Sequence, residues 1–498
     1  MPEILAIDLG TSTCKATAYA ETGRVLRRAS RILTTHRPAS GLAEQDAAVW
    51  WDAAVHAGRE AAAGVAIDTI SLTSCREAVA LTDTDGVPLA PVMMWMDRRG
   101  TREARALAAA FPDVQRLTGH RPDANFTACK MAWLSRHHPD LLRAARWLLQ
   151  PRDFLYFHLT GMPITDPSLA SRTLWWRRDA GWWPDVLEFS GVTGAQLPQV
   201  MPSHAAPGRL SPAAARALGV RGGIPVVVGA GDRTCEVIAA RALGGRVLVS
   251  LGTAVNVSTM VSKPVPDDRL VFSAAAVEGM EVAEQGIPSG SALLDWLQGL
   301  VGAERADLQA RAAQVAPGAE GLVLLPFLGG SRATRWNPNA SGVVAGLSLS
   351  TRREALLRSG MEGVACEVRA ALGVLRQAGV ATDALVFVGG PAQHSVWPRV
   401  IEDVCNMPGV AVADTEAASM GAFLLAGRAV GTWDDPLVAS ETRNPDIARW
   451  DPDPTAAAYY VQHAAAYEAL YAALETWFAR FGARAYSDVD DDARDRPR

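Results

Sequence analysis

The sequence predicts an α/β protein made of two halves of related architecture that face each other across a cleft. The first observation is a strand–turn–strand pattern that occurs twice, over residues 4–20 and 246–260, each time with a turn rich in Gly, Ser and Thr. The second is the alternation of strand-like and helix-like segments up to about residue 240, which is typical of α/β chains. The third is that no low-complexity linker separates the halves, so we expect them to pack together.

The composition indicates a large globular protein. At roughly 150 residues per domain, 498 residues predict two to four domains. Hydrophobic residues make up 49% and charged residues 20%, which excludes a mainly disordered, collagen-like or coiled-coil chain. A net charge of −5 argues against nucleic acid or an anionic membrane as a partner. We find no signal peptide and no apolar run long enough to span a membrane, so we expect no membrane association.

The cysteines indicate the compartment. The six are widely spaced, without a C-x-x-C pair or a histidine at zinc-finger spacing. A disulfide framework is not expected in a chain of this size, because such frameworks belong to small secreted domains. We therefore expect a cytoplasmic protein.

The first half begins with the strands on which this prediction rests. Apolar runs between turn signals predict strands over residues 4–7, 14–20, 25–33 and 67–73. Helical composition predicts helices over residues 47–63 and 234–243, and the second of these would join the halves. We expect the N-terminal domain to span residues 1–243.

The second half repeats the pattern with different residues. Apolar runs predict strands over residues 246–251, 254–260 and 384–388. We expect two helices, a small-residue helix packed closely on a sheet and a final amphipathic one: residues 417–427 and 456–480. The C-terminal domain is expected to span residues 244–483. Residues 484–498 are crowded with Asp and Arg and predict a disordered tail.

The first turn, Asp8-Leu9-Gly10-Thr11-Ser12, is a candidate phosphate loop. Glycine lets a backbone approach a phosphate, Thr and Ser donate hydrogen bonds, and a carboxylate supplies a hard oxygen for Mg²⁺. The alternative is an ordinary hairpin with polar turn residues. The sequence contains no G-x-x-x-x-G-K-[ST] motif and no G-x-G-x-x-G motif after a strand, which argues against P-loop and Rossmann proteins.

Three later loops add to this chemistry. Ser250-Leu251-Gly252-Thr253 repeats the first turn, so the two could grip one nucleotide triphosphate from both sides. Asp232 stands on a Gly-flanked turn that opens a helix, where it suits either a general base or a helix N-cap. Gly389-Gly390 follows a strand and suits either a flat ligand against bare backbone or a tight turn.

Taken in chain order, these segments resemble the FGGY family of carbohydrate kinases. The matching segments are Ile7-Asp8-Leu9-Gly10-Thr11-Ser12 with Lys15, Glu44-Gln45-Asp46 with Trp50-Trp51, Trp95-Met96-Asp97-Arg98-Arg99, Phe126-Thr127-Ala128-Cys129-Lys130, Pro151-Arg152-Asp153-Phe154 with Thr165-Asp166, Gly231-Asp232, Ser250-Leu251-Gly252-Thr253, residues 326–346, and Gly389-Gly390 through Trp397. They follow one order over nearly the whole chain. Two departures bear on nucleotide affinity: Ser331 stands where many relatives have Glu, and Pro391 where a third Gly is common.

The resemblance implies a fold and an activity. It implies two actin- and hexokinase-like (RNase H-like) domains around the cleft and the Mg²⁺-ATP-dependent phosphorylation of a sugar or polyol. Asp232 matches the catalytic base, and Asp8 and Asp232 match the metal-linked carboxylates. The residues that would contact ATP are Thr11, Ser12, Lys15, Gly252, Thr253, Gly389, Gly390 and Gln393.

The acceptor is less clear from the sequence. The length and layout resemble xylulokinases, whereas Arg76-Glu77 resembles the substrate loop of glycerol kinases. Asn125 replaces an aromatic residue of glycerol kinases, and Arg233 after the base could bind a carboxylate bidentately or a row of hydroxyls. A structural ion pair is the alternative for Arg76-Glu77. We expect the acceptor to contact Arg76, Glu77, Asn125, Asp232 and Arg233.

Several functions stay open at this point. A ketopentose of the xylulose type is the first expectation for the acceptor, followed by glycerol or another polyol and by a sugar acid (aldonate). A sugar sensor without catalysis is the least favoured alternative, because Asp8 and Asp232 are intact. The chain could also form a homodimer.

Lysine is rare in this sequence. Of the 48 basic residues, only Lys15, Lys130 and Lys263 are lysines. Codon bias in a GC-rich genome explains the arginine excess. The alternative is that Lys15 and Lys130, which lie in the matching segments, stand where a compact ammonium fits and a planar guanidinium does not.

Overall fold

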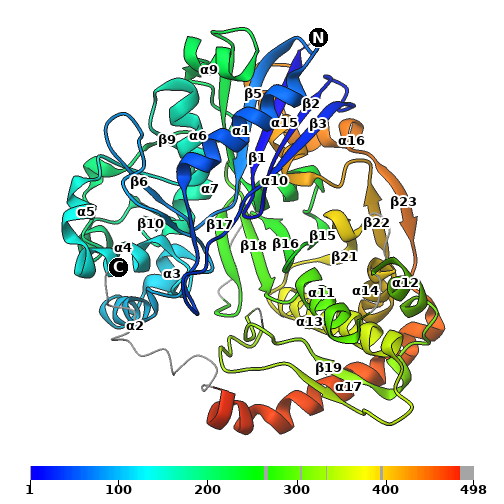
Figure 1. Cartoon of the computed structure of the whole chain (residues 1–498). Coiled ribbons are helices and arrows are strands. Elements are labelled where there is room, and N and C mark those ends of the chain that lie inside the picture. The colour runs from blue at the N-terminus through cyan, green and yellow to red at the C-terminus, as the bar shows by residue number, and fades with distance from the viewer. Residues whose placement is uncertain (1, 263–266, 303–304, 333, 393–395, 483–498) are drawn as a thin grey trace.

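The computed structural model describes residues 2–262, 267–302, 305–332, 334–392 and 396–482. Two large sheets organise this part of the chain, one from each half of the sequence (Figure 1). Gln393, Lys263 and the predicted tail lie outside the described residues. Within the described residues, no helix is both long and apolar enough to cross a membrane.

The first sheet has six strands. In spatial order they are β13 (Gly208–Arg209), β14 (Pro225–Gly231), β5 (Ile67–Ser74), β1 (Glu3–Leu9), β2 (Thr13–Tyr19) and β3 (Val25–Ile32). Strands β1, β5 and β14 run parallel, whereas β1, β2 and β3 form an antiparallel meander. Because side chains alternate along a strand, β1 faces two cores: Leu5 and Ile7 pack on one side, Ile4 and Ala6 on the other.

The second sheet has seven strands and repeats this plan. In spatial order they are β23 (Asp446–Trp450), β22 (Gly409–Val412), β21 (Thr382–Val388), β15 (Gly245–Leu251), β16 (Val255–Val261), β18 (Glu281–Ile287) and β17 (Val271–Ala274). Strand β15 pairs parallel with β21 and antiparallel with β16, as β1 does with β5 and β2. The strands predicted on both sides of the two turns are therefore confirmed.

Two helices lie between the sheets and join them. Helix α10 (Asp232–Ala239) follows β14, and α15 (Ala417–Ala429) follows β22. They pack closely because Gly421 has no side chain: a Cβ there would lie 2.1 Å from the carbonyl oxygen of Cys235. Their apolar residues form one core with β1 and β15, so the two halves share buried surface.

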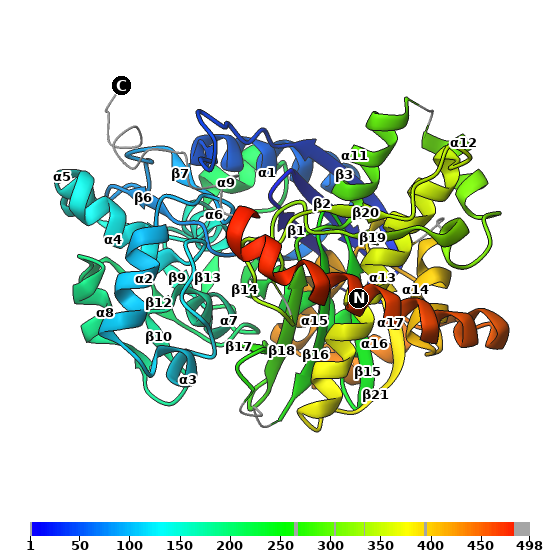
Figure 2. The same ribbon diagram turned by 90° about the horizontal axis from the view of Figure 1, so that it is seen from below.

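The segment between β5 and β13 differs from the prediction of continued strand and helix alternation. It forms helices and two-stranded ribbons with a core of their own around Leu107, Trp133, Trp175 and Val186. The reason is that its strands have only two or three residues and pair with one another, as β6 (Ala80–Thr82) does with β8 (Trp147–Leu149). This region lies on the opposite side of the molecule from α12 and α14 (Figures 1 and 2).

The remaining elements complete the two halves. The short paired strands are β4 (Glu44–Gln45) with β7 (Val92–Met93), β9 (Ile164–Thr165) with β12 (Gln199–Val200), β10 (Trp176–Arg177) with β11 (Gly181–Trp182), and β19 (Val323–Leu325) with β20 (Val343–Ala345). The helices of the first half are α1 (Ala47–Ala62), α2 (Thr101–Ala110), α3 (Val114–Thr118), α4 (Thr127–His137), α5 (Pro139–Ala144), α6 (Pro151–Thr160), α7 (Pro167–Ala170), α8 (Pro184–Phe189) and α9 (Pro212–Leu218). Those of the second half are α11 (Ser291–Val301), α12 (Arg305–Ala312), α13 (Arg353–Gln377), α14 (Trp397–Cys405), α16 (Pro436–Arg443) and α17 (Pro454–Trp477).

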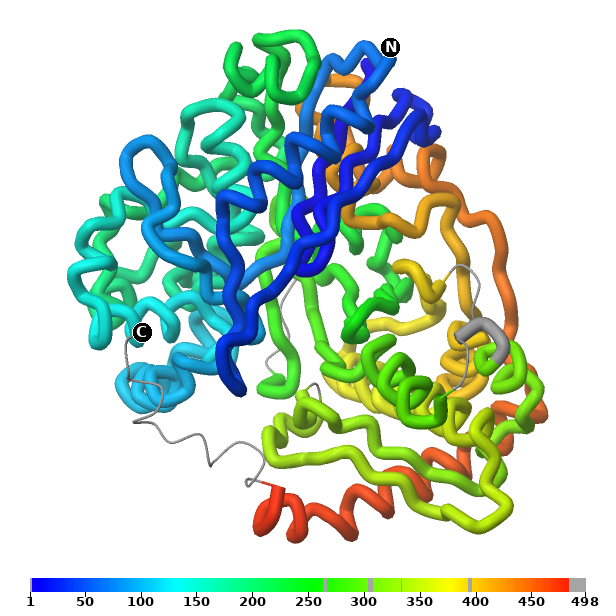
Figure 3. The backbone as a smooth tube through the Cα atoms, viewed as in Figure 1, coloured from blue at the N-terminus to red at the C-terminus, as the bar shows by residue number. Residues whose placement is uncertain are grey.

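Two predicted helix ends need correction. The helix predicted over residues 234–243 stops at Ala239, because Arg241 adopts a left-handed backbone with φ +50°. The helix predicted over residues 456–480 ends at Trp477 and continues as one π turn, Phe478–Gly482. Its Tyr460 and Tyr467 pack into the core of the second half, so that α17 runs along the outside of this half (Figure 3).

Candidate active site

The first turn is held in shape by contacts from outside it. The Gly10 N–H donates to the Thr13 carbonyl at 3.0 Å and closes the turn between β1 and β2. The Thr11 hydroxyl accepts from Trp95 Nε1 at 2.9 Å, and the Thr11 carbonyl accepts from Gln45 Nε2 at 2.7 Å. Two of the segments noted in the sequence therefore support this turn.

Asp8 presents a carboxylate oxygen that has no hydrogen-bond partner. It lies at the end of β1, opposite Lys15 in the register with β2, and its buried Oδ1 has no hydrogen-bond partner. Burial raises the pKa of Asp8 to about 8 although the Lys15 ammonium opposes this shift. The nearby carboxylates of Asp232, Glu416 and Glu236 raise the pKa further.

This arrangement fits a magnesium–phosphate complex. In the described part of the chain, no three His, Cys, Asp or Glu side chains come close enough to one another to hold a metal ion by themselves. Mg²⁺ does not require such a cage, since it binds through one or two carboxylates together with phosphate oxygens and water. The unpartnered oxygen of Asp8 is a donor of this kind.

The second turn, between β15 and β16, is also closed by the N–H of its glycine but is one residue shorter. The Gly252 N–H donates to the Ala254 carbonyl at 3.1 Å. The carbonyls of Gly252 and Thr253 accept from the N–H groups of Ser291 and Gly290, at 2.8 and 3.0 Å. These two residues lie at the start of α11, which therefore fixes the turn from the second half.

Gly389 closes against this second turn. It has φ +90°, and a Cβ there would lie only 2.2 Å from the Leu251 carbonyl oxygen. Its N–H donates to the Thr415 carbonyl at 3.1 Å. Gly390 follows in the short turn Gly390–Ala392, where a Cβ would meet no atom within 4 Å. The first glycine is therefore needed for packing, and the second leaves open space.

Asp232 is the first residue of α10, and Gly231, not Asp232, is the N-cap. Asp232 Oδ1 accepts from the Arg233 N–H at 2.7 Å and lies 3.4 Å from Arg76 Nε. Gly231 is required here because its Cβ would lie 2.9 Å from Arg76 Cδ, and its N–H donates to Ser168 Oγ at 2.9 Å. A carboxylate at a helix N-terminus is also favoured by the helix dipole.

A buried ion pair supports the strand that leads to Asp232. The fully buried Arg152 donates to Asp166 Oδ1 at 2.7 Å and to the Val228 carbonyl at 2.9 Å. Asp166 in turn caps α7 through the Ser168 N–H at 3.0 Å. The sequence segments that contain Arg152 and Asp166 therefore act as a scaffold for the Asp232 turn.

Arg76 and Glu77 lie in a buried cluster of alternating charges. Both Nη atoms of Arg76 donate to Glu284, at 3.0 Å each, while Glu77 accepts from Arg172. Arg172 also approaches Glu284 at 3.9 Å. Burial would lower the pKa of Arg76, but Glu284, Glu77 and Asp232 offset this effect and the pKa is raised. Burial would raise the pKa of Glu284, but Arg76 and Arg172 hold it well below its usual range.

Lys130 holds the backbone of the loop that contains Glu77. Its buried ammonium donates to the carbonyls of Glu77 and Met94 at 2.6 Å and to that of Met93 at 3.3 Å. Burial lowers the pKa of Lys130 to about 8. Glu77 has φ +56°, an uncommon backbone for a residue other than glycine, and the Lys130 contact holds its carbonyl.

Asn125 immediately precedes Phe126, whose ring contacts Arg172 of this cluster. It is 5% exposed, and its Oδ1 has no hydrogen-bond partner. The adjacent Phe126 ring lies 5.3 Å from the Arg172 guanidinium and 5.2 Å from the His120 ring. His120 is fully buried, and its pKa is lowered well below the ordinary value by burial.

The side chain of Arg233 reaches the second turn. Its Nη1 donates to Glu236 at 2.7 Å and to Ser250 Oγ at 2.8 Å. The structure therefore brings Arg76, Glu77 and Asp232 into one connected set, whereas Arg233 joins this set to the phosphate side. Its expected acceptor contact stays a prediction.

Two residues of the cluster were not assigned a role from the sequence. Glu284 lies on β18 and Arg172 on the turn after α7, far from Arg76 in the chain. A charged residue in a buried strand requires a partner of opposite charge, but β18 (EVAEQGI) also contains Glu281 and Gln285, so its sequence did not single out Glu284. Nothing in the sequence identified that partner.

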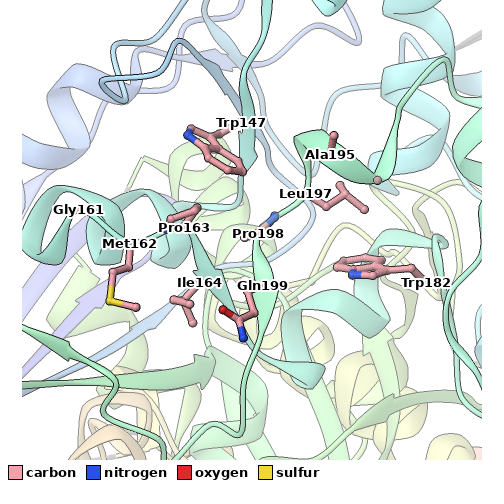
Figure 4. A pocket seen from close by; sticks show the side chains of 11 residues that line it. Trp147, Gly161, Met162, Pro163, Ile164, Trp182, Ala195, Leu197, Pro198 and Gln199 are labelled. Carbon is pink, nitrogen blue, oxygen red and sulfur yellow. The ribbon is translucent and has the colours of Figure 1, made fainter.

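A cavity of about 570 Å³ lies elsewhere (Figure 4). It is lined by Trp147, Gly161, Met162, Pro163, Ile164, Trp182, Gly194, Ala195, Leu197, Pro198 and Gln199. None of the candidate site residues lines it. Its walls are largely apolar and belong to the segment between β5 and β13.

Curated relatives cover most of the chain. The protein is 29% identical over 412 residues to the xylulose kinase of Escherichia coli (strain K12), which covers 80% of this chain and 84% of the relative. It is 26% identical over 453 residues to the gluconokinase of Bacillus subtilis (strain 168), which covers 86% of this chain and 88% of the relative.

A solved structure confirms the fold class. The xylulose kinase from Rhodospirillum rubrum superposes with a TM-score of 0.85 at 28% identity, over 96% of this chain and 100% of that one. The predicted actin- and hexokinase-like α/β fold is therefore confirmed. The models for the N-terminal and C-terminal domains of the FGGY family match residues 3–239 and 247–430. The chain belongs to the FGGY family of carbohydrate kinases.

Proposed function

We propose that this carbohydrate kinase transfers the terminal phosphoryl group of ATP to a hydroxyl of a small sugar or polyol, with a xylulose-type ketopentose as the first candidate. One observation carries the proposal. Asp232 stands between the charged cluster, through its 3.4 Å contact with Arg76, and the second turn, through Arg233 and Ser250. A group in this position can act on an acceptor hydroxyl that faces a phosphate.

Asp232 is the proposed general base. Phosphoryl transfer needs the acceptor oxygen oriented and its proton removed as the new bond forms. The Arg233 N–H fixes one carboxylate oxygen of Asp232, and Arg76 restrains the same oxygen from the other side. The second oxygen is the one that we propose receives the proton.

The two turns are the proposed phosphate sites. Thr11 and Ser12 of the first turn and Gly252 and Thr253 of the second would donate hydrogen bonds to phosphate oxygens, with Lys15 adding a positive charge. Beside the second turn, bare backbone at two glycines would receive the adenine: Gly389 and Gly390. Gln393, also expected to bind ATP, lies outside the described residues.

Asp8 and Asp232 would hold the magnesium ion. The unpartnered Oδ1 of Asp8 supports this assignment. A bound Mg²⁺ neutralises phosphate charge as it develops during transfer. The high pKa of the free Asp8 carboxyl means that nucleotide and metal would bind together with the loss of its proton.

The acceptor side supports a polyhydroxy compound. Arg76 and Glu77 lie in one buried cluster of charged groups, and Asn125 offers an unpaired amide oxygen. The match with the Escherichia coli xylulose kinase supports a ketopentose, and Arg76-Glu77 keeps glycerol or another polyol as an alternative. The match with a gluconokinase keeps a sugar acid as a further one.

We also propose the setting in which the enzyme works. All six cysteines are buried with free thiols, which supports a reducing compartment such as the cytoplasm.

We place the domain boundary between Leu243 and Gly244, where Gly244 and Gly245 both have positive φ values. A homodimer stays a prediction.

The test is ADP release with a panel of C3–C6 polyols, ketoses and aldonates. We expect turnover with at least one acceptor and a fall in kcat of roughly 10²–10⁴-fold in Asp232→Asn, with ATP still bound. Asp185→Asn, which changes an acid in the first turn of α8, is the matched control and should keep full activity. If Asp232→Asn turns over at the wild-type rate, the assignment of Asp232 as the base is overturned. If wild type turns over none of the acceptors, the proposed function is overturned.

A further inference from the structure

Glu284 reaches the acceptor cluster from the other half of the molecule. It lies on β18 in the second sheet, yet both of its oxygens accept from Arg76, which follows β5 in the first sheet. The two residues are 6% and 7% exposed. A bidentate pair of this geometry is the arrangement in which arginine binds any carboxylate.

With this pairing, every nitrogen of the Arg76 guanidinium already faces a carboxylate. Both Nη atoms are used by Glu284, and Nε faces Asp232 at 3.4 Å. An acceptor carboxylate that approached Arg76 would have to displace Glu284 and leave a buried charge unpaired. Leaving such a charge unpaired is strongly unfavourable.

The other arginines around Asp232 are also occupied. Arg172 is paired with Glu77, and Arg233 with Glu236. Among the described residues of this cluster, three guanidinium groups therefore stand against the four carboxylates of Glu77, Asp232, Glu236 and Glu284. The cluster has an excess of negative charge, so the carboxylate of an acidic acceptor would be repelled.

We propose that Glu284 selects against acidic acceptors: it occupies the bidentate face of Arg76 and restricts the site to uncharged sugars and polyols. The inference rests on the proposed function, because it concerns the acceptor of the same site. Glu284 acts through Arg76 and is a positioning residue. Its removal should free Arg76 for a carboxylate of the acceptor.

The experiment compares kcat/KM for two acceptors of equal carbon number, the ketose D-xylulose and the aldonate D-xylonate, with D-gluconate as a second aldonate. In wild type the ketose should be preferred. In Glu284→Gln the ratio of aldonate to ketose should rise by about tenfold or more, because a negative charge at the acceptor site is removed. KM for ATP should stay unchanged.

Two variants separate selectivity from structure. Glu284→Asp keeps the charge and should restore a ratio close to that of wild type. Glu281→Gln breaks the ion pair between Glu281 and Arg178. This pair also joins β18 to the segment between β5 and β13, but it lies outside the charged cluster, so the ratio should stay unchanged. Thermal unfolding of each variant shows that it folds.

The outcomes distinguish this inference from the proposed function. If wild type phosphorylates no acceptor at all, the proposed function fails first. If wild type is active but prefers the aldonate, or if Glu284→Gln lowers kcat/KM for both acceptors equally, the role of Glu284 is overturned. If Glu284→Gln does not fold, the test uses Glu284→Asp at a pH above 5. This variant must still prefer the ketose, and a preference for the aldonate would overturn the role of Glu284.

Discussion

The two halves of this kinase have the same scaffold but different chemistry at equivalent positions. Strands β14, β5, β1 and β2 of the first sheet correspond in order and direction to β22, β21, β15 and β16 of the second. The helices that follow, α10 and α15, cross at Gly421. Equivalent residues can therefore be read directly from the register of the two sheets.

The turns show the difference most clearly. Asp8 stands opposite Lys15 in the first half, and at the equivalent register Ser250 stands opposite Asn256. A charged pair in one half thus corresponds to a neutral pair in the other. The charged pair supplies a carboxylate with an unpartnered buried oxygen, whereas Ser250 and Asn256 contain no carboxylate at all.

The difference shows how one scaffold serves two ligands. The first half gathers the charged groups that would act on phosphate and acceptor, with Asp8 and Asp232 at strand and helix ends. The second half uses small or neutral residues such as Gly252 and Gly389, which bring bare backbone close to a nucleotide. A substitution at one position of either half should therefore show whether that half responds as its chemistry requires.

The largest effect is expected where the second half requires a glycine. Asp8 stands opposite Thr73 and Ser250 opposite Val388, so Gly389 corresponds to a serine, Ser74. In Gly389→Ala the new Cβ would lie 2.2 Å from the Leu251 carbonyl at a φ of +90°. We expect a loss of roughly 3 kcal/mol or more in the free energy of unfolding and a KM for ATP raised about tenfold.

Gly390→Ala is the matched control for this variant. No atom lies within 4 Å of its Cβ position, so its thermal stability should equal that of wild type. A rise in KM for ATP in Gly390→Ala at unchanged stability would indicate that adenine lies against that residue. Equal stability of Gly389→Ala and wild type would contradict the close contact between the turns.

The sequence predicted the parts of this structure that depend on neighbours in the chain. The strands around the two turns were found because apolar residues between Gly, Ser and Thr signals are local patterns. Asp8 and Asp232 were found for the same reason, since each follows a strand. The structure brings Asp232 next to Arg76, which the sequence could only suggest through the family resemblance.

The parts that were missed depend on contacts between distant residues. Arg76 and Glu284 are 208 residues apart, and no periodicity connects β18 with the loop after β5. The strands between β5 and β13 were missed because each has two or three residues, too few for an alternating pattern. The contacts of the Lys130 ammonium with three backbone carbonyls, those of Glu77, Met93 and Met94, are likewise contacts between distant residues that the sequence could not specify.

The next effect concerns the carboxylate of the charged pair. In Asp8→Asn, without nucleotide or metal, we expect the free energy of unfolding at pH 8 to exceed that of wild type by about 1–4 kcal/mol. Burial raises the pKa of Asp8 from 3.8 to about 8, so between these values the unfolded chain is ionised while the folded chain still holds the proton. Wild type therefore loses stability relative to the variant as the pH rises from about 4 to 8.

Denaturant unfolding in EDTA at pH 4, 6 and 8 measures this difference, which should grow with pH and become constant above pH 8. Asp140→Asn is the control, because Asp140 is a surface residue whose replacement should change the free energy of unfolding by less than about 0.5 kcal/mol. A difference between Asp8→Asn and wild type that is the same at all three values would contradict the burial of this carboxyl. The activity of Asp8→Asn should be lost at every pH.

The smallest effect tests the other member of the charged pair. Lys15 forms an ion pair with Glu416 and stands opposite Asp8, where the second half has the neutral Asn256. In Lys15→Arg we expect KM for ATP to rise about three- to tenfold, because a planar guanidinium directs its donors differently from a compact ammonium. The free energy of unfolding should change by less than about 0.5 kcal/mol, since the pair is partly exposed.

Steady-state kinetics with ATP as the varied substrate measures the effect, and Lys15→Met, which removes the charge, should raise KM further. An unchanged KM and kcat in Lys15→Arg would mean that lysine at this position reflects no chemical requirement, and that only the charge distinguishes the first turn from the second.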